Sequence, residues 1–340
     1  MAAEFGFDRT AFTSVDTAAE DRDFLLRWLA EGNAADMARW LARDPERRAD
    51  PRTFLPGALS VISLGVSYFT NPAPPPTAGG RPLPAGRVAR YAWGEDYHDV
   101  LLGRVDSFGR ALAREIPGLA ARPAVDAGPL LERAFARRGG AGFVGKNTNL
   151  IFGSCGSWFF LTELVVNIPL PEGPPAPQGC GECAACRTAC PTGALDVPFC
   201  LDARRCAAYH TVENRGSIPE ALRPRMGSRL FGCDDCQEGC PFNARPLESR
   251  WPEFSAGRGA GPWVLLEDVL AIRAEAEFKA RFGRTPLARA KRQGLVRNAC
   301  VVARNIGAAD ELRGLLIECR DEDESPVVRE HAAWALGEVK

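Results

Sequence analysis

The sequence lacks the segments that would direct a chain into or across a membrane. It begins Met-Ala-Ala-Glu-Phe-Gly-Phe-Asp, with no basic stretch followed by an apolar stretch of the secretory type. No later apolar run approaches the roughly 20 residues that a membrane-spanning helix needs. We therefore expect a cytoplasmic protein without a membrane partner.

The sequence also lacks an excess of charge of either sign. Its 42 Lys and Arg residues nearly balance 43 Asp and Glu residues, so the formal net charge is −1 and indicates no class of partner. Hydrophobic residues make up 46% and charged residues 25%, as in ordinary soluble globular proteins. A chain of 340 residues predicts about two domains, with room for a small insert.

Cysteine, by contrast, is abundant: twelve residues, most of them in two runs. The run from Cys180 to Pro191 has the spacing C-x2-C-x2-C-x3-C-P, which holds [4Fe–4S] clusters in bacterial ferredoxins. Three closely spaced thiolates reach one cluster, and the fourth reaches a second. The run from Cys233 to Pro241 is the same pattern short of one cysteine. Its missing ligand is Cys206 or Cys200, and spacing leaves both open.

Two other uses of cysteine fit less well. Paired C-x2-C units bind structural zinc, but a four-ligand zinc site does not explain one complete run followed by a second set. A disulfide framework suits short secreted chains, and this chain is long and has no leader. The cysteine spacing therefore predicts two iron–sulfur clusters in a reducing compartment.

The first half of the chain alternates helical and strand patterns. Residues 1–50 predict helices, with Trp28, Met37 and Trp40 on apolar stripes that we expect in the core. Residues 58–68 are a β-rich run typical of a buried strand. The Pro- and Gly-rich residues 71–86 predict a loop or lid within one fold.

Two segments of this half carry polar side chains that suggest a site. Tyr91, Trp93, Tyr97 and His98 precede an amphipathic helix to about Glu115, where a single Asp or His would otherwise be a helix cap or a surface residue. Val125-Asp126 precedes a helix with Pro129 near its first turn. Asp126 is a candidate for chemistry there, and the alternative is a capping residue.

The glycine-rich segment from Gly140 to Asn147 resembles two nucleotide-binding motifs. Both need a strand before the glycines and a helix after them, whereas here a helix comes before and strands come after. Asn147 also replaces the Ser or Thr that would hold magnesium. We reject both motifs and expect the glycines to allow close approach of another segment or a flat ligand.

The C-terminal part turns basic after a stretch, 261–282, that predicts helix. No acidic residue occurs between Arg281 and Ala309. Residues 295–307 and 327–338 share a pattern of apolar residues, Arg, Ala and Gly, which indicates stacked helical repeats. A charged run is more often a solvated helix face, but unopposed cations on such a surface suit a phosphate backbone.

Taken together, these segments resemble the epoxyqueuosine reductases, cobalamin-dependent iron–sulfur enzymes of queuosine biosynthesis in tRNA. The resemblance covers nearly the whole chain. Besides the cysteine runs, which many ferredoxin-like proteins share, it rests on Tyr91-Ala-Trp-Gly-Glu-Asp-Tyr-His, on Gly142-Phe-Val-Gly-Lys-Asn-Thr-Asn-Leu-Ile and on Glu213-Asn-Arg-Gly-Ser-Ile-Pro. His210 stands where we expect an apolar residue, and the repeat tail is shorter than we expect for this family.

The resemblance implies an α/β (α+β) fold in three parts. Residues 1–170 would form a cobalamin-binding catalytic domain like that of reductive dehalogenases. Residues 171–250 would form a ferredoxin-like module with two [4Fe–4S] clusters. Residues 251–340 would form a HEAT-like helical repeat region that contacts tRNA.

The resemblance also implies roles for individual residues. One cluster would be held by Cys180, Cys183, Cys186 and Cys240, and the other by Cys190, Cys206, Cys233 and Cys236, which selects Cys206 over Cys200. Asp126 stands in the position of the family's catalytic acid, which must be protonated when it acts. Expected cobalamin contacts are Arg52, Tyr91, Trp93, Tyr97, His98, Asp126, Lys146, Asn147, Asn149, Leu150, Cys233 and Asp234. Expected tRNA contacts are Arg215, Arg284, Lys291, Arg292, Arg297, Asn298 and Arg304.

The implied activity is reduction of epoxyqueuosine to queuosine in tRNA by a monomer. A one-electron donor such as a flavodoxin or ferredoxin would feed the clusters, and these would feed cobalamin. A non-catalytic electron carrier would explain the cysteines and repeats, but it leaves residues 50–165 without a purpose. A cobalamin-dependent dehalogenase would use the same cofactors, yet the absence of an export signal and the basic tail argue against it.

Overall fold

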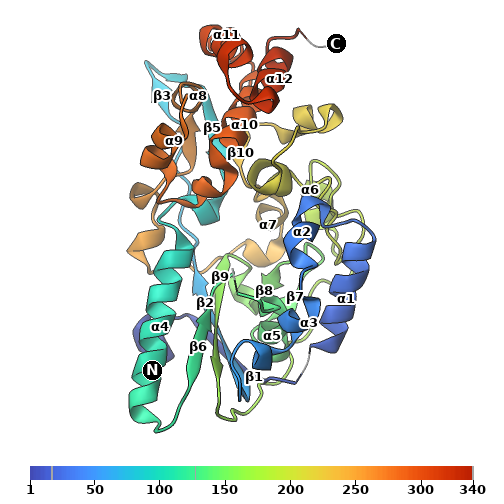
Figure 1. Cartoon of the computed structure of the whole chain (residues 1–340), viewed down its shortest axis with the longest axis vertical. Coiled ribbons are helices and arrows are strands. Elements are labelled where there is room, and N and C mark those ends of the chain that lie inside the picture. The colour runs from blue at the N-terminus through green and yellow to red at the C-terminus, as the bar shows by residue number, and fades with distance from the viewer. Residues whose placement is uncertain (17, 127, 339–340) are drawn as a thin grey trace.

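The computed structural model describes residues 1–16, 18–126 and 128–338. Figure 1 shows a four-stranded sheet at one end of the molecule and the C-terminal helices α11 and α12 at the other. The sheet has the strand order β1-β2-β9-β6 and is antiparallel throughout. Its strands are β1 (Arg9–Ser14), β2 (Ser60–Ser67), β6 (Ala121–Ala124) and β9 (Phe159–Val166).

Helices cover both faces of this sheet. Side chains alternate between the two faces of a strand. Ile62 and Leu64 of β2 accordingly pack in one core with Leu101 and Val105 of α4 (Tyr97–Glu115). Val61 belongs to a second core with residues of α5 (Glu132–Arg138). Every residue of β2 is buried and none is charged, so β2 is the buried strand that the sequence predicted.

A second, three-stranded sheet joins distant parts of the chain. β5 (Ala85–Val88) lies in the middle, parallel to β10 (Arg229–Phe231) and antiparallel to β11 (Trp263–Leu265). A short hairpin, β3 (Thr77–Ala78) and β4 (Arg81–Pro82), precedes β5 within the segment that we predicted to be a loop. The three parts predicted from the sequence therefore share hydrogen bonds in one sheet.

The N-terminal segment departs from the prediction. It forms strand β1 before the helices α1 (Ala19–Ala30), α2 (Ala38–Leu41) and α3 (Pro45–Ala49). None of the residues of α1, all of which the structure describes, is fully buried. Trp28 is half-buried and donates its indole N–H to the Leu201 carbonyl, Met37 is half-buried, and Trp40 is 38% exposed. The prediction that all three lie in the core is wrong, because these short helices lie on the surface.

The C-terminal part is helical, as predicted, with one strand in it. β11 is followed by α8 (Leu266–Leu270), α9 (Glu275–Phe282), α10 (Lys291–Asn305), α11 (Arg313–Glu322) and α12 (Pro326–Ala335). Helix α10 is buried over most of its length and packs with β10, α8 and α12 in the largest hydrophobic core. Of the helices that the structure describes, none is long and apolar enough to cross a membrane.

Candidate active site and cluster ligands

Asp126 lies just after β6 and carries two hydrogen-bonding neighbours from the start of α4. The Tyr97 hydroxyl donates to Asp126 Oδ2 at 2.5 Å, and His98 Nε2 lies 3.4 Å from the same oxygen. Asp96 caps α4 by accepting the His98 backbone N–H, and its Oδ1 also lies 2.7 Å from His98 Nδ1. The Tyr97 ring is stacked between His98 and Phe160. This packing fixes the donors around Asp126.

Asp126 and His98 carry opposite charges at neutral pH. The hydrogen bond from His98, with help from Tyr97, holds the pKa of Asp126 below its usual range, and the Asp126 side chain is 60% exposed. Burial favours a neutral His98, but its bonds to Asp126 and Asp96 outweigh burial and raise the pKa of His98 to about 9. At neutral pH the proton therefore resides on His98. The expectation that Asp126 is protonated when it acts stays a prediction, and His98 is the nearest source of that proton.

The backbone at Asp126 is also unusual. Its φ is 47°, in the left-handed region that non-glycine residues seldom adopt. Its N–H donates to Glu132 Oε1 at 2.6 Å, at the first position of α5. Asp126 is therefore not the cap of this helix. The hydrogen bond to Glu132 was not predicted, because Glu132 stood in the sequence as an ordinary first-turn carboxylate.

The first cysteine set surrounds a small cavity. Cys180, Cys183, Cys186 and Cys240 line it, next to Asn147 and Phe242. Within the part of the chain that the structure describes, no three His, Cys, Asp or Glu side chains could hold a single metal ion. Zinc binds thiolates at about 2.3 Å and needs tightly converging ligands. The spacing of these thiols fits a larger cluster better than one ion.

The second set includes Cys206 rather than Cys200. Burial and then the charges of Cys233 and Cys206, followed by Asp234 and Cys190, raise the pKa of Cys236 well above its usual range. These four thiols are therefore neighbours. Cys200 lies apart, 3.8 Å from the Asn33 side chain. This favours Cys206 over Cys200, and the choice of Cys206 as a ligand stays a prediction.

The glycine segment joins the catalytic part to the cysteine segment. It forms the hairpin of β7 (Phe143–Val144) and β8 (Leu150–Ile151), so strands follow the glycines, as predicted. A Cβ at Gly140 would lie 2.2 Å from the Pro174 carbonyl oxygen, so the close approach is to protein backbone. Lys146 donates to the Gly181 and Cys183 carbonyls, and Asn147 donates to that of Cys236.

The other expected cobalamin contacts differ in exposure: some are buried and others lie on the surface. Trp93 is 3% exposed and donates to the Val88 carbonyl, so its assignment to a cofactor surface is wrong, because the ring is part of the core. Leu150 and Asp234 are also buried, and Asp234 accepts the Arg90 N–H at 2.7 Å. Arg52 is exposed and paired with Asp50, and Asn149 is half-buried.

Comparisons with known proteins give the family. Residues 48–127 match the family model "Epoxyqueuosine reductase QueG", and residues 179–243 match a "4Fe-4S double cluster binding domain". The chain is 39% identical to the epoxyqueuosine reductase of Xanthomonas campestris, over 99% of this chain and 94% of that one. It is also 39% identical to that of Escherichia coli K12, over 98% and 86%. The chain belongs to the epoxyqueuosine reductase family.

Solved epoxyqueuosine reductases have the same fold. A crystal structure of one with an epoxyqueuosine-modified tRNA-Tyr stem loop aligns with a TM-score of 0.91 at 33% identity, over 99% of this chain and 88% of that one. Another, from Bacillus subtilis with its catalytic loop swung out of the active site, aligns at 0.89 and 32%, over the same shares. Family membership makes this chain an oxidoreductase.

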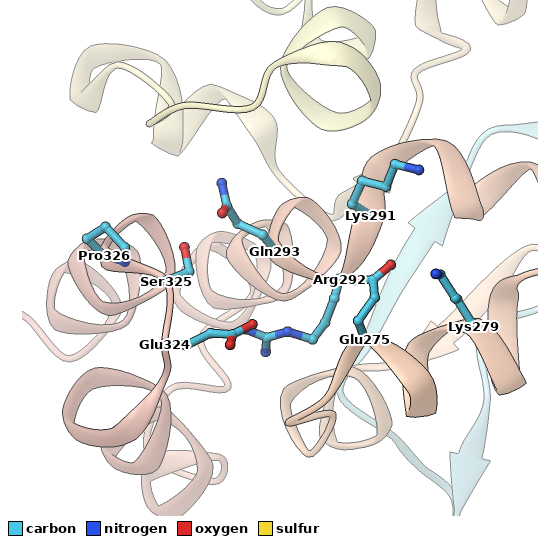
Figure 2. Close-up of a pocket in the computed structure, with 8 residues that line it drawn as sticks. All are labelled: Glu275, Lys279, Lys291, Arg292, Gln293, Glu324, Ser325 and Pro326. Carbon is cyan, nitrogen blue, oxygen red and sulfur yellow. The ribbon is translucent and has the colours of Figure 1, made fainter.

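Three of the residues expected to contact tRNA are not on the surface. Arg292, Arg297 and Asn298 are 2%, 1% and 1% exposed. Arg292 makes two 2.8 Å bonds to the buried Asp323, and Figure 2 shows its side chain extended toward Glu324 while Lys291 points away. Arg297 donates to the carbonyls of Asn214, Gly216 and His210. The prediction that these three bind phosphate is wrong, because they hold α10 inside the protein.

The remaining basic residues are exposed. They are Arg215, Arg284, Lys291 and Arg304. Arg215 donates to the Arg289 carbonyl, and Arg289 is paired with Glu213 at 2.8 Å. The bond to Glu213 and, less strongly, the charge of Asp126 raise the pKa of Arg289. The sequence placed Arg289 only in the basic run, not at the site. His210, unexplained in the sequence, is a buried structural residue whose Nε2 lies 2.8 Å from the Arg204 carbonyl.

Proposed function

We propose that this chain reduces epoxyqueuosine to queuosine in the anticodon of tRNA, with electrons that pass from two [4Fe–4S] clusters to a bound cobalamin. The observation that carries the proposal is the Asp126 carboxylate, held by Tyr97 and His98 in a chain of this family that also gathers two sets of four cysteines. A one-electron donor such as a flavodoxin or ferredoxin supplies the electrons to a monomeric, cytoplasmic enzyme.

The chemistry of the donor set supports two clusters. Each set offers four thiols, the number that a [4Fe–4S] cluster takes. Cys240, from the second run, joins the first set, and Cys190, from the first run, joins the second set. The exposed Cys183 lies in the first set, so that set is where an external donor delivers electrons.

Tyr91 links the surroundings of Asp126 to the second cysteine set, because its ring centroid lies 6.1 Å from that of Tyr97 and 6.1 Å from that of Phe231, two residues before Cys233. Burial and then the charges of Asp234 and Asp126 raise the pKa of Tyr91, so Tyr91 lies near both carboxylates. Tyr91, Tyr97, His98, Asp126 and Asn149 are the residues that would hold cobalamin in this position. When bound, cobalamin supplies a cobalt centre that takes single electrons and reduces the substrate.

The protein's own contribution is a proton for the epoxide oxygen. That oxygen leaves poorly as an alkoxide, so a hydrogen-bonded acid lowers the barrier. His98 holds the proton at neutral pH and shares the Asp126 Oδ2 atom with the Tyr97 hydroxyl. Asp126 then passes the proton from His98 to the substrate oxygen.

The exposed cations support a tRNA surface along the C-terminal part. Arg215, Arg284, Lys291 and Arg304 are the residues that would contact phosphate, and α10, α11 and α12 would form a HEAT-like repeat. The packing of α12 against both α10 and α11 is the contact pattern that such a repeat requires. The relative solved with a tRNA stem loop has the same fold.

Turnover by wild type and Asp126→Asn tests the function. Anaerobically reconstituted enzyme, with iron and cobalt quantified, is given tRNA that carries epoxyqueuosine and a chemical one-electron reductant. Wild type should form queuosine, and Asp126→Asn should be slower by about 10²–10⁴-fold, because Asn cannot carry the proton. Product formed at equal rates by both would show that Asp126 is not the acid. Loaded wild type that forms no queuosine would exclude the function.

A further inference from the structure

A buried carboxyl group without a hydrogen bond lies at the centre of the four-stranded sheet. Glu163 of β9 is paired in register with Ser63 of β2 and with Ala124 of β6, and it is 0% exposed. Neither of its carboxyl oxygens has a hydrogen-bond partner within 3.5 Å among residues 1–16, 18–126 and 128–338, although Glu132 and Ser63 lie close enough to change its pKa. The Ser63 hydroxyl beside it is also without one there. A carboxylate that keeps its charge in such a place is costly, so we expect this group to be protonated.

Glu132 brings a second carboxyl group to the same face of the sheet. It begins α5, whose Ala134 and Phe135 pack with Val165 of β9 and with Ala124, the register partner of Glu163. Burial raises the pKa of Glu163 well above its usual range, and the charge of Glu132 raises it further. Burial and then the charge of Asp126 raise the pKa of Glu132 as well. Arg133 acts in the opposite direction on Glu132. Two adjacent carboxyl groups with one nearby cation hold one proton between them, because both cannot ionise together at low cost.

Glu132 in turn holds the loop of the catalytic residue. Its Oε1 accepts the Asp126 N–H at 2.6 Å, at a residue whose φ is 47°. A non-glycine residue in the left-handed region persists only where its surroundings hold it there. Of these surroundings, the Tyr97 and His98 contacts act on the side chain of Asp126, whereas Glu132 acts on its backbone.

We propose that Glu132 is a positioning residue that fixes the Asp126 loop in its working conformation, and that Glu163 keeps it in place by sharing one proton with it. Loss of that proton at high pH leaves two carboxylates side by side. Their repulsion moves Glu132 away from the Asp126 N–H and releases the loop. The role of Glu132 rests on the proposed function of Asp126, whereas its hydrogen bond can be tested without turnover.

Hydrogen exchange at the Asp126 amide measures this bond directly. In the reconstituted full-length protein at neutral pH, Glu132→Ala should lower the protection of this amide by about 10- to 100-fold, the size expected for one hydrogen bond to a charged group. Glu132→Gln should restore it, since an amide oxygen still accepts the N–H. Wild type should lose the protection at alkaline pH, and Glu163→Gln should retain it there, because Gln cannot ionise.

Turnover separates positioning from chemistry. Glu132→Ala should lower kcat by about 10- to 100-fold with little change in the KM for tRNA, as a displaced catalytic group does. Glu163→Gln has the shape of the native side chain and should fold and turn over like wild type at neutral pH. Glu115→Gln, on the exposed end of α4, is the matched control and should change nothing.

Two results would overturn the assignment. One is unchanged protection of the Asp126 amide in Glu132→Ala. The other is a Glu163→Gln protein that loses protection at the same alkaline pH as wild type. Failure of the proposed function would appear differently, as loaded wild type that forms no queuosine while these exchange differences remain.

Discussion

His98 sits between two carboxylates and is the residue on which the pH behaviour of the site depends. Its pKa of about 9 in the folded protein lies above the ordinary value of about 6.5. Protonated His98 therefore stabilises the fold fully below about pH 6.5, and this contribution is lost as the pH rises through about 9. The loss coincides with loss of the proton that Asp126 needs.

The small number of histidines makes this measurable. The chain has three, and burial lowers the pKa of both His210 and His331. In histidine-labelled protein, NMR should show one imidazole titrating near pH 9 and two that stay neutral above pH 7. The titrating signal should be absent from His98→Gln. If the His98 signal titrated near pH 6.5 instead, His98 would be mostly neutral at pH 7 and could not supply the proton.

The tertiary contacts of the site could not be predicted from sequence, although its chemistry could. Asp126, Tyr97 and His98 were predicted to belong together, and they lie within hydrogen-bond reach of one another. Where the proton rests could not be predicted, since it depends on two carboxylates meeting one imidazole. Glu132 could not be recognised, because only the register of β9 brings Glu163 beside it.

Among the elements, α10 illustrates how a basic pattern can mislead. The sequence pattern predicted that its arginines lie on the surface. Instead, Arg292 and Arg297 point inward, where Arg292 donates to Asp323 and Arg297 donates to backbone carbonyls. Asp323 lies 31 positions further along the chain, so local sequence gave no sign of the pair. The strands β2 and β9 and the helix α4, in contrast, were predicted, because the residue pattern of each lies within its own short segment of sequence.

Charge reversal in α10 separates the buried arginine from its exposed neighbour. Arg292→Glu leaves Asp323 buried beside a like charge, and breaking such a pair costs about 3–5 kcal/mol. Its melting temperature, measured by circular dichroism, should fall by about 5–15 °C. Lys291 directly precedes Arg292 and is exposed, so Lys291→Glu should melt within about 2 °C of wild type.

The same two variants also distinguish stability from tRNA binding. Lys291→Glu should weaken tRNA binding and lower the slope of log affinity against log salt by about one, as expected for one lost phosphate contact. If Arg292→Glu melted like wild type, the buried ion pair would not be a stabilising contact. Unchanged tRNA affinity in Lys291→Glu would place the contact surface elsewhere.

At the scale of the whole molecule, the proposed two clusters would divide the iron between the two cysteine sets. Cys183 lies in the first set and Cys236 in the second. Cys183→Ser and Cys236→Ser should each retain about half of the iron of wild type, since each removes one ligand of one cluster. Cys200→Ser is the control and should keep all of it, because Cys200 lies beside Asn33 and apart from both sets. Full iron loss in every variant would indicate a single shared centre.

The central strand of the second sheet has a consequence for how the protein is made. β5 has no partner in the sheet until β10 and then β11 emerge, and β11 follows it by about 175 residues, or roughly 10–35 s at ordinary ribosome speeds. Both cysteine runs leave the ribosome within that interval, before β11 and α10 can complete the core against which Cys233 packs. The nascent chain thus has a period in which its thiols are open to the machinery that delivers iron and sulfide. Slower translation of residues 241–300 would lengthen that period.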